Sequence, residues 1–292
     1  MYRLFSLVFL AIFSIAQGAD TKPEATALWE KGKAPDGEGG FTDEVSNIFL
    51  YHPKNPNGTI AVVCPGGGYG GLVMGGEGHG IAKWLGESGI SAVVLKYRLP
   101  AGRSSVPLLD AQRAIRFARM NAKKWNCDPS RIGIIGFSAG GHLAATAATQ
   151  FEKGDGSSDD PFLRESCRPD FAILVYPVIT MGEFSHGGSR NRLLGKHPSK
   201  EMVRLFSAEL QVTKETPPVF LAHAKDDSVV PIENSQIFHK AMKENEVNSK
   251  LMELPSGNHG LNGYKGPMWD AWQDGSIEWL REQRLIPRKG DE

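Results

Sequence analysis

The chain has 292 residues, and its 33 basic and 33 acidic side chains give a formal net charge of zero. Hydrophobic residues make up 40% of it and charged residues 23%, which are ordinary proportions for a globular enzyme, and the length suits one large domain. The balance of charge gives no electrostatic reason to expect a nucleic acid or an acidic membrane as a partner, and we expect neither.

The first residues have the pattern of a secretory signal peptide. Arg3 precedes an apolar run over residues 4–15, and small and polar residues follow that run, as they do at signal cleavage sites. The run is roughly a dozen residues long, whereas about 20 are needed to cross a bilayer. We therefore expect residues 1–19 to be a signal peptide, the mature protein to have no membrane segment, and its location to be secreted or periplasmic. An uncleaved anchor is the alternative.

The rest of the chain alternates between strand and helix patterns. Residues 20–40 are rich in Gly, Pro and charge, have no apolar period, and are expected to form an arm or surface loop. The predicted strands are residues 47–51, 59–64, 91–97, 131–136, 171–176, 219–223 and 250–254, and the predicted helices are residues 78–88, 106–121, 139–149, 232–245 and 269–285. This alternation is typical of a mostly parallel sheet with helices on both faces, so we expect one α/β domain over residues 41–287.

A Gly-rich segment follows the second predicted strand. Residues 64–69 read CPGGGY, and three residues without side chains let backbone N–H groups approach a bound carbonyl closely. Gly67 and Gly68, together with Ala139, are therefore the expected donors of an oxyanion hole. A phosphate-binding loop is the alternative, but the segment lacks the Lys-Ser/Thr of a P-loop and the spacing of a dinucleotide fingerprint.

Two polar clusters near these strands have structural interpretations. Glu77 and His79 could contact a substrate, but helix capping explains them as well. Arg98, Asp110 and Arg113 lie near a strand end and on a helix, where we expect an ion pair that ties the two elements together.

Ser138 lies in a strand–turn–helix pattern. Residues 136–140 read Gly-Phe-Ser-Ala-Gly, directly after a predicted strand and at the start of a predicted helix. This G-x-S-x-G pattern is typical of a nucleophile elbow, whose glycines permit a sharp turn that exposes the serine hydroxyl at the positive end of a helix. We therefore expect Ser138 to be a nucleophile.

The longest interruption of the alternating pattern is residues 180–217. It is rich in Gly, Ser, Arg and Lys and holds a helix-like piece at residues 200–210. We expect this insertion to form a small cap beside the site. It contains few apolar runs that could line a tunnel for a fatty acyl chain.

A serine hydroxyl is a poor nucleophile at its free pKa, so it needs a base, and the base needs an orienting carboxylate. Two candidate acids, Asp226 and Asp227, lie in the loop after the strand predicted at residues 219–223. Of the eight histidines only His259 lies in a predicted loop beyond these acids, between the last predicted strand and the last predicted helix. His259 is therefore the expected base.

The other reactive side chains have structural interpretations. Cys64, Cys127 and Cys167 permit at most one disulfide, and their spacing fits no metal site. His142, on the helix after the elbow, and His223, at a strand end, are expected to be packed structural residues.

Several segments along the chain carry a family resemblance. PGGGYGGL, WLGESGI, AVVLKYRLP, DAQRAIRF, GFSAGGHLAA, LVYPVI, HAKDDSVVPIENS and NHGL resemble the acetyl xylan and feruloyl esterase-like branch of the α/β-hydrolases, over nearly the whole chain after the signal peptide. The resemblance implies an α/β-hydrolase fold, ester hydrolysis by Ser138, Asp227 and His259, and no metal or organic cofactor. Asp227 is favoured over Asp226 because the D-x-x-V-P pattern common after this strand in α/β-hydrolases begins there.

The resemblance has one departure. The Gly-rich loop begins with Cys64-Pro65, where many relatives have a histidine, so the outer support of this loop stays open. The motifs identify the fold and mechanism well and the substrate poorly, because related chains include peptidases and lipid esterases.

From these features we expect an exported serine carboxylic-ester hydrolase that removes acetyl or feruloyl groups from plant polysaccharide such as xylan, through an acyl-enzyme on Ser138. Tyr69 and Tyr264, near the expected rim, are candidates to stack on sugar rings. A serine exopeptidase of the prolyl oligopeptidase type is one alternative, although the chain has neither the length nor the repeats of the propeller that such enzymes carry. A non-catalytic binding protein with the same fold is the other.

Overall fold

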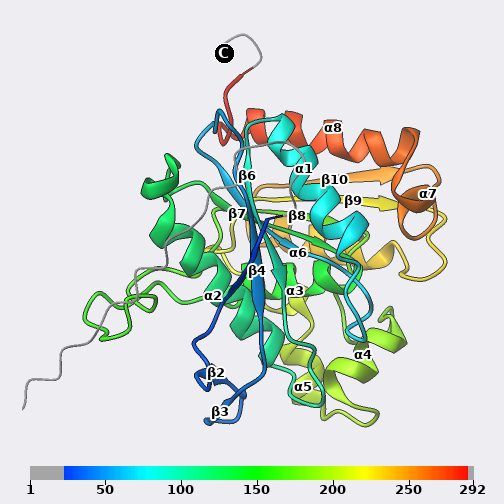
Figure 1. Ribbon diagram of the computed structural model, residues 1–292. Helices are drawn as coiled ribbons and strands as arrows, with labels where there is room; N and C mark the ends of the chain where they lie inside the picture. Colours follow the sequence, from blue (N-terminus) through cyan, green and yellow to red (C-terminus); the bar gives the residue numbers. More distant parts are fainter. Residues whose placement is uncertain (1–22, 289–292) are drawn as a thin grey trace, which may run out of the picture.

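The computed structural model describes residues 23–288, which fold around an 8-stranded sheet with the order β1-β4-β6-β5-β7-β8-β9-β10. In chain order these strands are β1 (Ala25–Ala27), β4 (Asn47–Tyr51), β5 (Ile60–Cys64), β6 (Ser91–Lys96), β7 (Ile132–Phe137), β8 (Phe171–Val175), β9 (Val219–Ala224) and β10 (Ser249–Leu254). Strand β4 pairs antiparallel with β1 and β6, and all other pairs of this sheet are parallel. The predicted mostly parallel sheet is confirmed (Figure 1).

The central strands are buried on both faces, which explains their continuous apolar sequences. Every residue of β5, β7, β8 and β9 is buried. Within β7, Gly133 is required by packing, because a Cβ there would lie 2.1 Å from the ring of Phe171 on the neighbouring strand. The close approach is at the amino-terminal ends of the two strands, where Gly133 pairs with Phe171.

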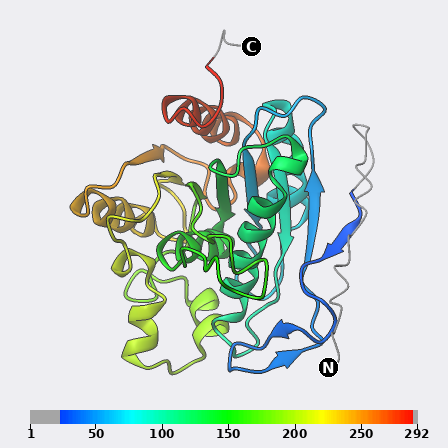
Figure 2. The same ribbon diagram turned by 90° about the vertical axis from the view of Figure 1, so that its left-hand side faces the viewer.

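Helices cover the two faces of the sheet, and alternate strand residues point to each layer. Ile60 and Val62 pack with α2 (Val106–Asn121), α3 (Ser138–Thr149) and α6 (Glu233–Glu244). Ala61 and Val63 pack with α1 (Gly80–Glu87) and α8 (Pro267–Glu282) on the opposite face. The period of two along β5 thus divides the core into two layers. The turned view in Figure 2 shows helices on both sides of the sheet.

The segment expected to be an arm or loop belongs partly to the sheet. Ala25–Ala27 pairs with the outer edge of β4, and Leu28, which follows, is only 3% exposed. Farther on, β2 (Ala34–Pro35) and β3 (Phe41–Thr42) form a small separate hairpin. A strand of three residues is too short for an apolar period, so its sequence carried no strand signal. The open edge of β4 supplies its hydrogen bonds.

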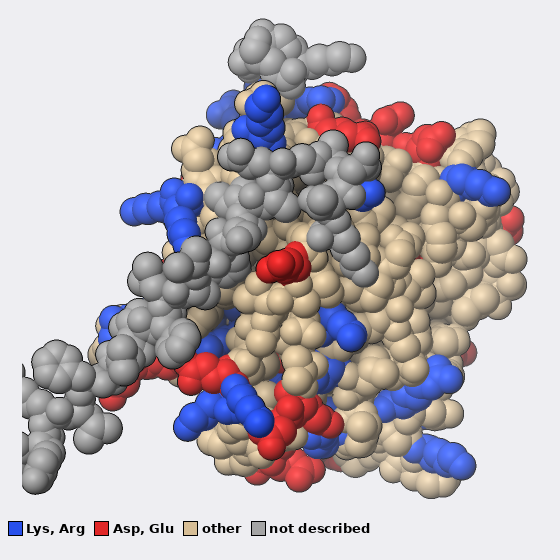
Figure 3. Space-filling view, viewed as in Figure 1, with Lys and Arg blue, Asp and Glu red and all other residues tan. Residues whose placement is uncertain are grey.

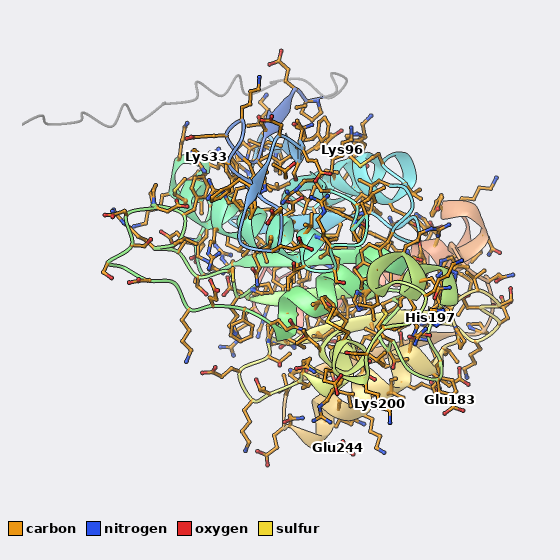
Figure 4. All side chains as sticks on the ribbon, turned by 90° about the horizontal axis from the view of Figure 1, so that it is seen from below. Lys33, Lys96, Glu183, His197, Lys200 and Glu244 are labelled. Carbon is orange, nitrogen blue, oxygen red and sulfur yellow. The ribbon has the colours of Figure 1, made fainter. Side chains whose placement is uncertain are left out.

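The insertion at residues 180–217 contains α4 (Gly187–Leu194), α5 (Lys200–Leu205) and the short helix η3 (Ala208–Leu210). The piece predicted as one helix at residues 200–210 is therefore broken, and a helix precedes it. We refer to residues 180–217 as the cap. Figure 4 shows its residues Glu183, His197 and Lys200 on the underside of the molecule.

Asn234, at the start of α6, anchors the beginning of the cap. Its side chain is fully buried, and its Oδ1 accepts hydrogen bonds from the N–H groups of Ile179 and Thr180 at 2.9 and 3.2 Å. Its Nδ2 donates to the carbonyl oxygen of Phe184. One amide side chain therefore satisfies three backbone groups where the chain leaves the sheet.

The predicted ion pair between a strand end and a helix is present. Asp110 is fully buried and accepts hydrogen bonds from the guanidinium and backbone N–H of Arg98 and from Trp29 Nε1. Arg113 does not join this pair but contacts Asp160 at 3.0 Å. The Trp29 bond also ties the amino-terminal segment to α2.

Neither sign of charge dominates the face seen in Figure 3, where Lys and Arg as well as Asp and Glu are scattered. Among the helices in residues 23–288, none has the length and apolar character to cross a membrane.

Candidate active site

Ser138 lies at a sharp turn between β7 and α3. Its φ of 51° is in the left-handed region, while Phe137 before it is extended. The turn depends on glycines: a Cβ on Gly136 would lie 2.2 Å from the Gly140 carbonyl oxygen, and one on Gly140 would lie 2.2 Å from that of Cys64. Strained backbone of this kind is typical of a nucleophile elbow.

The structure brings the three predicted triad side chains into contact. His259 Nε2 lies 2.9 Å from Ser138 Oγ, and His259 Nδ1 lies 2.8 Å from Asp227 Oδ2. Asp227 follows β9 and His259 follows β10, so all three residues come from the carboxyl ends of parallel strands. The side chain of His259 is 21% exposed, whereas that of Asp227 is fully buried.

Asp227 is held as a carboxylate. Burial raises its pKa, but hydrogen bonds from His223, from His259 and from the N–H of Val230 outweigh burial and bring the pKa well below its ordinary value. Its Oδ1 accepts from the N–H groups of Val229 and Val230, both at 2.9 Å. The bond to His259 Nδ1 then leaves His259 Nε2 as the atom that faces the serine.

Asp226 has a different task from its neighbour. Its carboxylate accepts from the N–H groups of Gly257 and Asn258, at 3.2 and 2.8 Å. It caps the loop that presents His259. The carboxylates of Asp226 and Asp227 therefore hold the backbone of that loop and its imidazole, respectively.

The two histidines expected to be structural are buried. His142 contacts the Phe206 carbonyl oxygen and the hydroxyl of Tyr69, and burial lowers its pKa to about 4. His223 contacts the Val230 carbonyl oxygen at 2.9 Å, but its Nε2 also lies 3.3 Å from Asp227 Oδ2. The sequence placed His223 at a strand end and carried no signal of that second contact.

The predicted oxyanion loop lies against the elbow. A Cβ on Gly66 would be 2.9 Å from Ser138 Cβ, and Gly67 and Gly68 have φ values of 130° and 61°. A loop of this shape needs glycine. The start of the loop is supported by Tyr97, whose hydroxyl donates to the Pro65 carbonyl oxygen at 2.7 Å.

The two tyrosines expected at the rim differ in position. Tyr69 is only 3% exposed and its hydroxyl lies 2.8 Å from His142 Nδ1, so its side chain packs inside the protein and not on the rim. The positive φ of Tyr69, 57°, turns the chain at this point. Tyr264 is half-buried, with its ring over Gly76 and edge-on to Trp269.

Two cap side chains lie against the oxyanion loop. Arg192 Nη1 donates to the carbonyl oxygen of Gly68 at 3.1 Å, and a Cβ on Gly68 would lie 3.8 Å from His186 Cε1. Burial, followed by the proximity of His259, lowers the pKa of His186. Neither residue belongs to a motif, so the sequence identified only the insertion that carries them.

The three cysteines are buried and unpaired in the structure. In the part of the chain that the structure describes, no three His, Cys, Asp or Glu side chains gather in a way that could hold a metal ion.

Sequence comparison places this chain among known esterases. The BD-FAE family profile matches residues 48–242, a range that ends before the loop of His259. Endo-1,4-beta-xylanase B of Butyrivibrio fibrisolvens is 37% identical over 250 residues, and acetylxylan esterase of Xylanibacter ruminicola is 37% identical over 264 residues. These alignments cover 84% and 89% of this chain, but only 39% and 50% of the relatives' own length.

Solved structures agree with this assignment. The acetyl ester-xyloside bifunctional hydrolase from Caldicellulosiruptor lactoaceticus superposes with a TM-score of 0.85 and 40% identity, covering 91% of this chain and 98% of that one. A carboxylesterase from Lactobacillus plantarum has a TM-score of 0.72 and 25% identity, covering 92% of this chain and 100% of that one. The predicted α/β-hydrolase fold is confirmed, and the chain belongs to the BD-FAE family of α/β-hydrolase esterases.

Proposed function

We propose that this protein is an exported serine esterase that removes short acyl groups, acetyl above all, from a carbohydrate such as xylan. The observation that carries the proposal is the chain of contacts from Asp227 through His259 to Ser138, at 2.8 and 2.9 Å. Ester hydrolysis by a serine nucleophile needs this geometry, because the base must reach the nucleophile and the carboxylate must orient the base.

The reaction follows from the positions of these groups. His259 Nε2 takes the proton of Ser138 Oγ as that oxygen attacks the ester carbonyl. Backbone N–H groups of Gly67, Gly68 and Ala139 would hold the oxyanion of the tetrahedral intermediate. His259 then returns the proton to the departing alcohol oxygen, which leaves an acyl-enzyme on Ser138. Water, activated by the same histidine, releases the acid and restores the serine.

The carbohydrate substrate is supported by the relatives' names and by the surroundings of the site. One relative is named acetylxylan esterase, and one solved structure is named an acetyl ester-xyloside hydrolase. In this chain the cap brings Arg192 and His186 beside Gly68, which suits a polar leaving group. A long acyl chain would need a largely apolar cleft, since each buried methylene contributes about 0.8 kcal/mol.

A panel of esters tests the proposal. Rates with p-nitrophenyl acetate, butyrate, octanoate and palmitate should be measured with acetate release from acetylated xylo-oligosaccharides, and kcat/KM is expected to be highest for acetate. Preference for octanoate or longer, with no release from any acetylated glycan, would contradict the substrate assignment. Ser138→Ala is the matched control: it should lose several orders of magnitude in kcat/KM with an unchanged circular dichroism spectrum.

Export is a separate part of the proposal and has its own test. It rests on the sequence of residues 1–19, which lie outside the described residues. Expression of the full chain in a bacterial host should yield periplasmic or secreted protein, whose amino-terminal sequence would begin near residue 20. Full-length protein retained in the cytoplasm would contradict it.

A further inference from the structure

A buried carboxyl group lies behind the oxyanion loop, and the triad mechanism does not use it. Glu77 is 3% exposed and belongs to the π-helical turn η1 (Gly75–His79). Single π-helical turns are frequent at functional sites. Its Oε2 accepts a hydrogen bond from the N–H of Gly66 at 2.7 Å, and its Oε1 accepts one from the hydroxyl of Tyr176 at 2.9 Å.

One end of this contact lies at the nucleophile. A Cβ on Gly66 would be 2.6 Å from Glu77 Oε2, 2.7 Å from the Phe137 carbonyl oxygen and 2.9 Å from Ser138 Cβ. Gly66 is thus wedged between the carboxylate and the elbow. The carboxylate holds the residue that directly precedes the two expected oxyanion donors.

The other end lies at the catalytic base. Tyr176 directly follows β8, and its φ of 37° is unusual for a residue with a side chain. Its ring is 4.8 Å from that of His259 in an edge-on arrangement. Residues held in strained backbone at a site usually have a functional reason for it.

Stability alone does not explain a carboxyl group at this position. Burial raises the pKa of Glu77 above its ordinary value, and the hydrogen bonds from Gly66, Tyr176 and Tyr264 offset only part of that rise. A lone buried carboxylate costs free energy when it ionises, and no ion pair to Glu77 occurs among residues 23–288.

We propose that Glu77 is a positioning residue that joins the oxyanion loop to the histidine: it fixes Gly66 beside Ser138 and, through Tyr176, sets the imidazole of His259. This inference rests on the proposed ester hydrolysis. Because its contacts reach the groups that act on the tetrahedral intermediate, its loss should weaken the transition state more than ground-state binding of the substrate.

Three variants test this role with p-nitrophenyl acetate. Glu77→Ala removes the contacts with Gly66 and Tyr176, along with that from Tyr264, and should lower kcat by about 100-fold with KM changed by less than about threefold, similar to the loss of an oxyanion donor. Glu77→Gln keeps acceptor and donor atoms at both positions and should stay within about tenfold of the wild type. Tyr176→Phe should lower kcat by about tenfold. In the double variant with Glu77→Ala, the same substitution should lower kcat by less than about tenfold, because the two residues act through one contact.

A matched control and a second readout separate positioning from folding. Glu209 is another carboxyl group whose pKa burial raises, and it lies in the cap on η3, so Glu209→Gln should leave kcat unchanged. An alkylboronic acid, which forms a tetrahedral adduct on serine, should lose affinity for Glu77→Ala in parallel with kcat/KM. Melting temperature and active-site titration correct each value for the folded fraction.

The role is overturned if corrected kcat and boronate affinity of Glu77→Ala equal those of the wild type. It is also overturned if Gln gives no rescue over Ala, or if only KM changes. A wild-type protein that hydrolyses none of the esters would refute the proposed function instead. In that case the positioning role is tested by the rate at which a fluorophosphonate labels Ser138, measured in the wild type and in the same variants.

Discussion

His223 Nε2 lies 3.3 Å from Asp227 Oδ2, the same oxygen that contacts His259 Nδ1 at 2.8 Å. A histidine in the core therefore shares the carboxylate with the histidine of the site. His223 is fully buried, and its Nδ1 lies 2.8 Å from the hydroxyl of Ser235. With Nε2–H directed at the Val230 carbonyl and at Asp227, Nδ1 accepts from Ser235, so α6 helps to set the position of the proposed acid of the triad.

Replacing His223 should damage both stability and rate. In His223→Leu, the Val230 carbonyl and the Ser235 hydroxyl lose a partner, at about 1–3 kcal/mol for each buried group, and Asp227 loses one donor. We expect a lower melting temperature and a fall of about tenfold in kcat for the folded fraction. Ser235→Ala is the control, since it removes only the outer contact. Wild-type kcat in His223→Leu would show that Asp227 needs no support from the core.

The two neighbouring aspartates should respond differently to the same change. Asp227→Asn disturbs the tautomer and orientation of His259 and should lower kcat/KM by on the order of 1,000 to 10,000-fold. Asp226→Asn keeps one acceptor oxygen for the His259 loop and should lower kcat/KM by less than about tenfold. The pair is compared by steady-state kinetics at one pH. A larger loss in Asp226→Asn would move the acid role by one residue.

Asp227 should also appear in the pH dependence of stability. Its folded-state pKa is depressed, because the hydrogen bonds outweigh burial, so its carboxylate stabilises the fold above the unfolded pKa of about 3.9. This contribution is lost as the pH falls towards the folded-state pKa. Urea unfolding between pH 7 and 3 should therefore show a steeper loss of free energy in the wild type than in Asp227→Asn. Parallel curves for the two proteins would contradict the depressed pKa.

The buried ion pair of Asp110 should matter for folding and not for chemistry. Its side chain is 0% exposed and that of Arg98 is 3% exposed, so Asp110→Ala leaves an unpaired buried guanidinium and should lower the free energy of unfolding by about 3–5 kcal/mol. Asp160→Ala breaks the pair with Arg113, in which the carboxylate is 39% exposed, and should cost less than about 1 kcal/mol. Denaturant unfolding measures both. Equal losses would show that burial does not decide the strength of these pairs.

Local patterns in the sequence were enough to predict the strands of the central sheet and the candidates for the triad. Continuous apolar runs mark β5 through β9, because a strand buried on both faces needs apolar residues at every position. The glycines around Ser138 mark the elbow, because a Cβ on Gly136 or on Gly140 would lie 2.2 Å from a backbone oxygen. The order of serine, acid and histidine left His259 as the one histidine in a predicted loop beyond the acid.

The tertiary structure decided everything that depends on residues far apart along the chain. Ser138 and His259 are 121 positions apart, and Tyr176 and Glu77 are 99 apart, so no local period relates them. The inward turn of Tyr69, the contact of His223 with Asp227 and the cap residues beside Gly68 are likewise products of topology. Parallel strands end at one edge of the sheet, and only the folded chain shows which side chains that edge brings within hydrogen-bond distance.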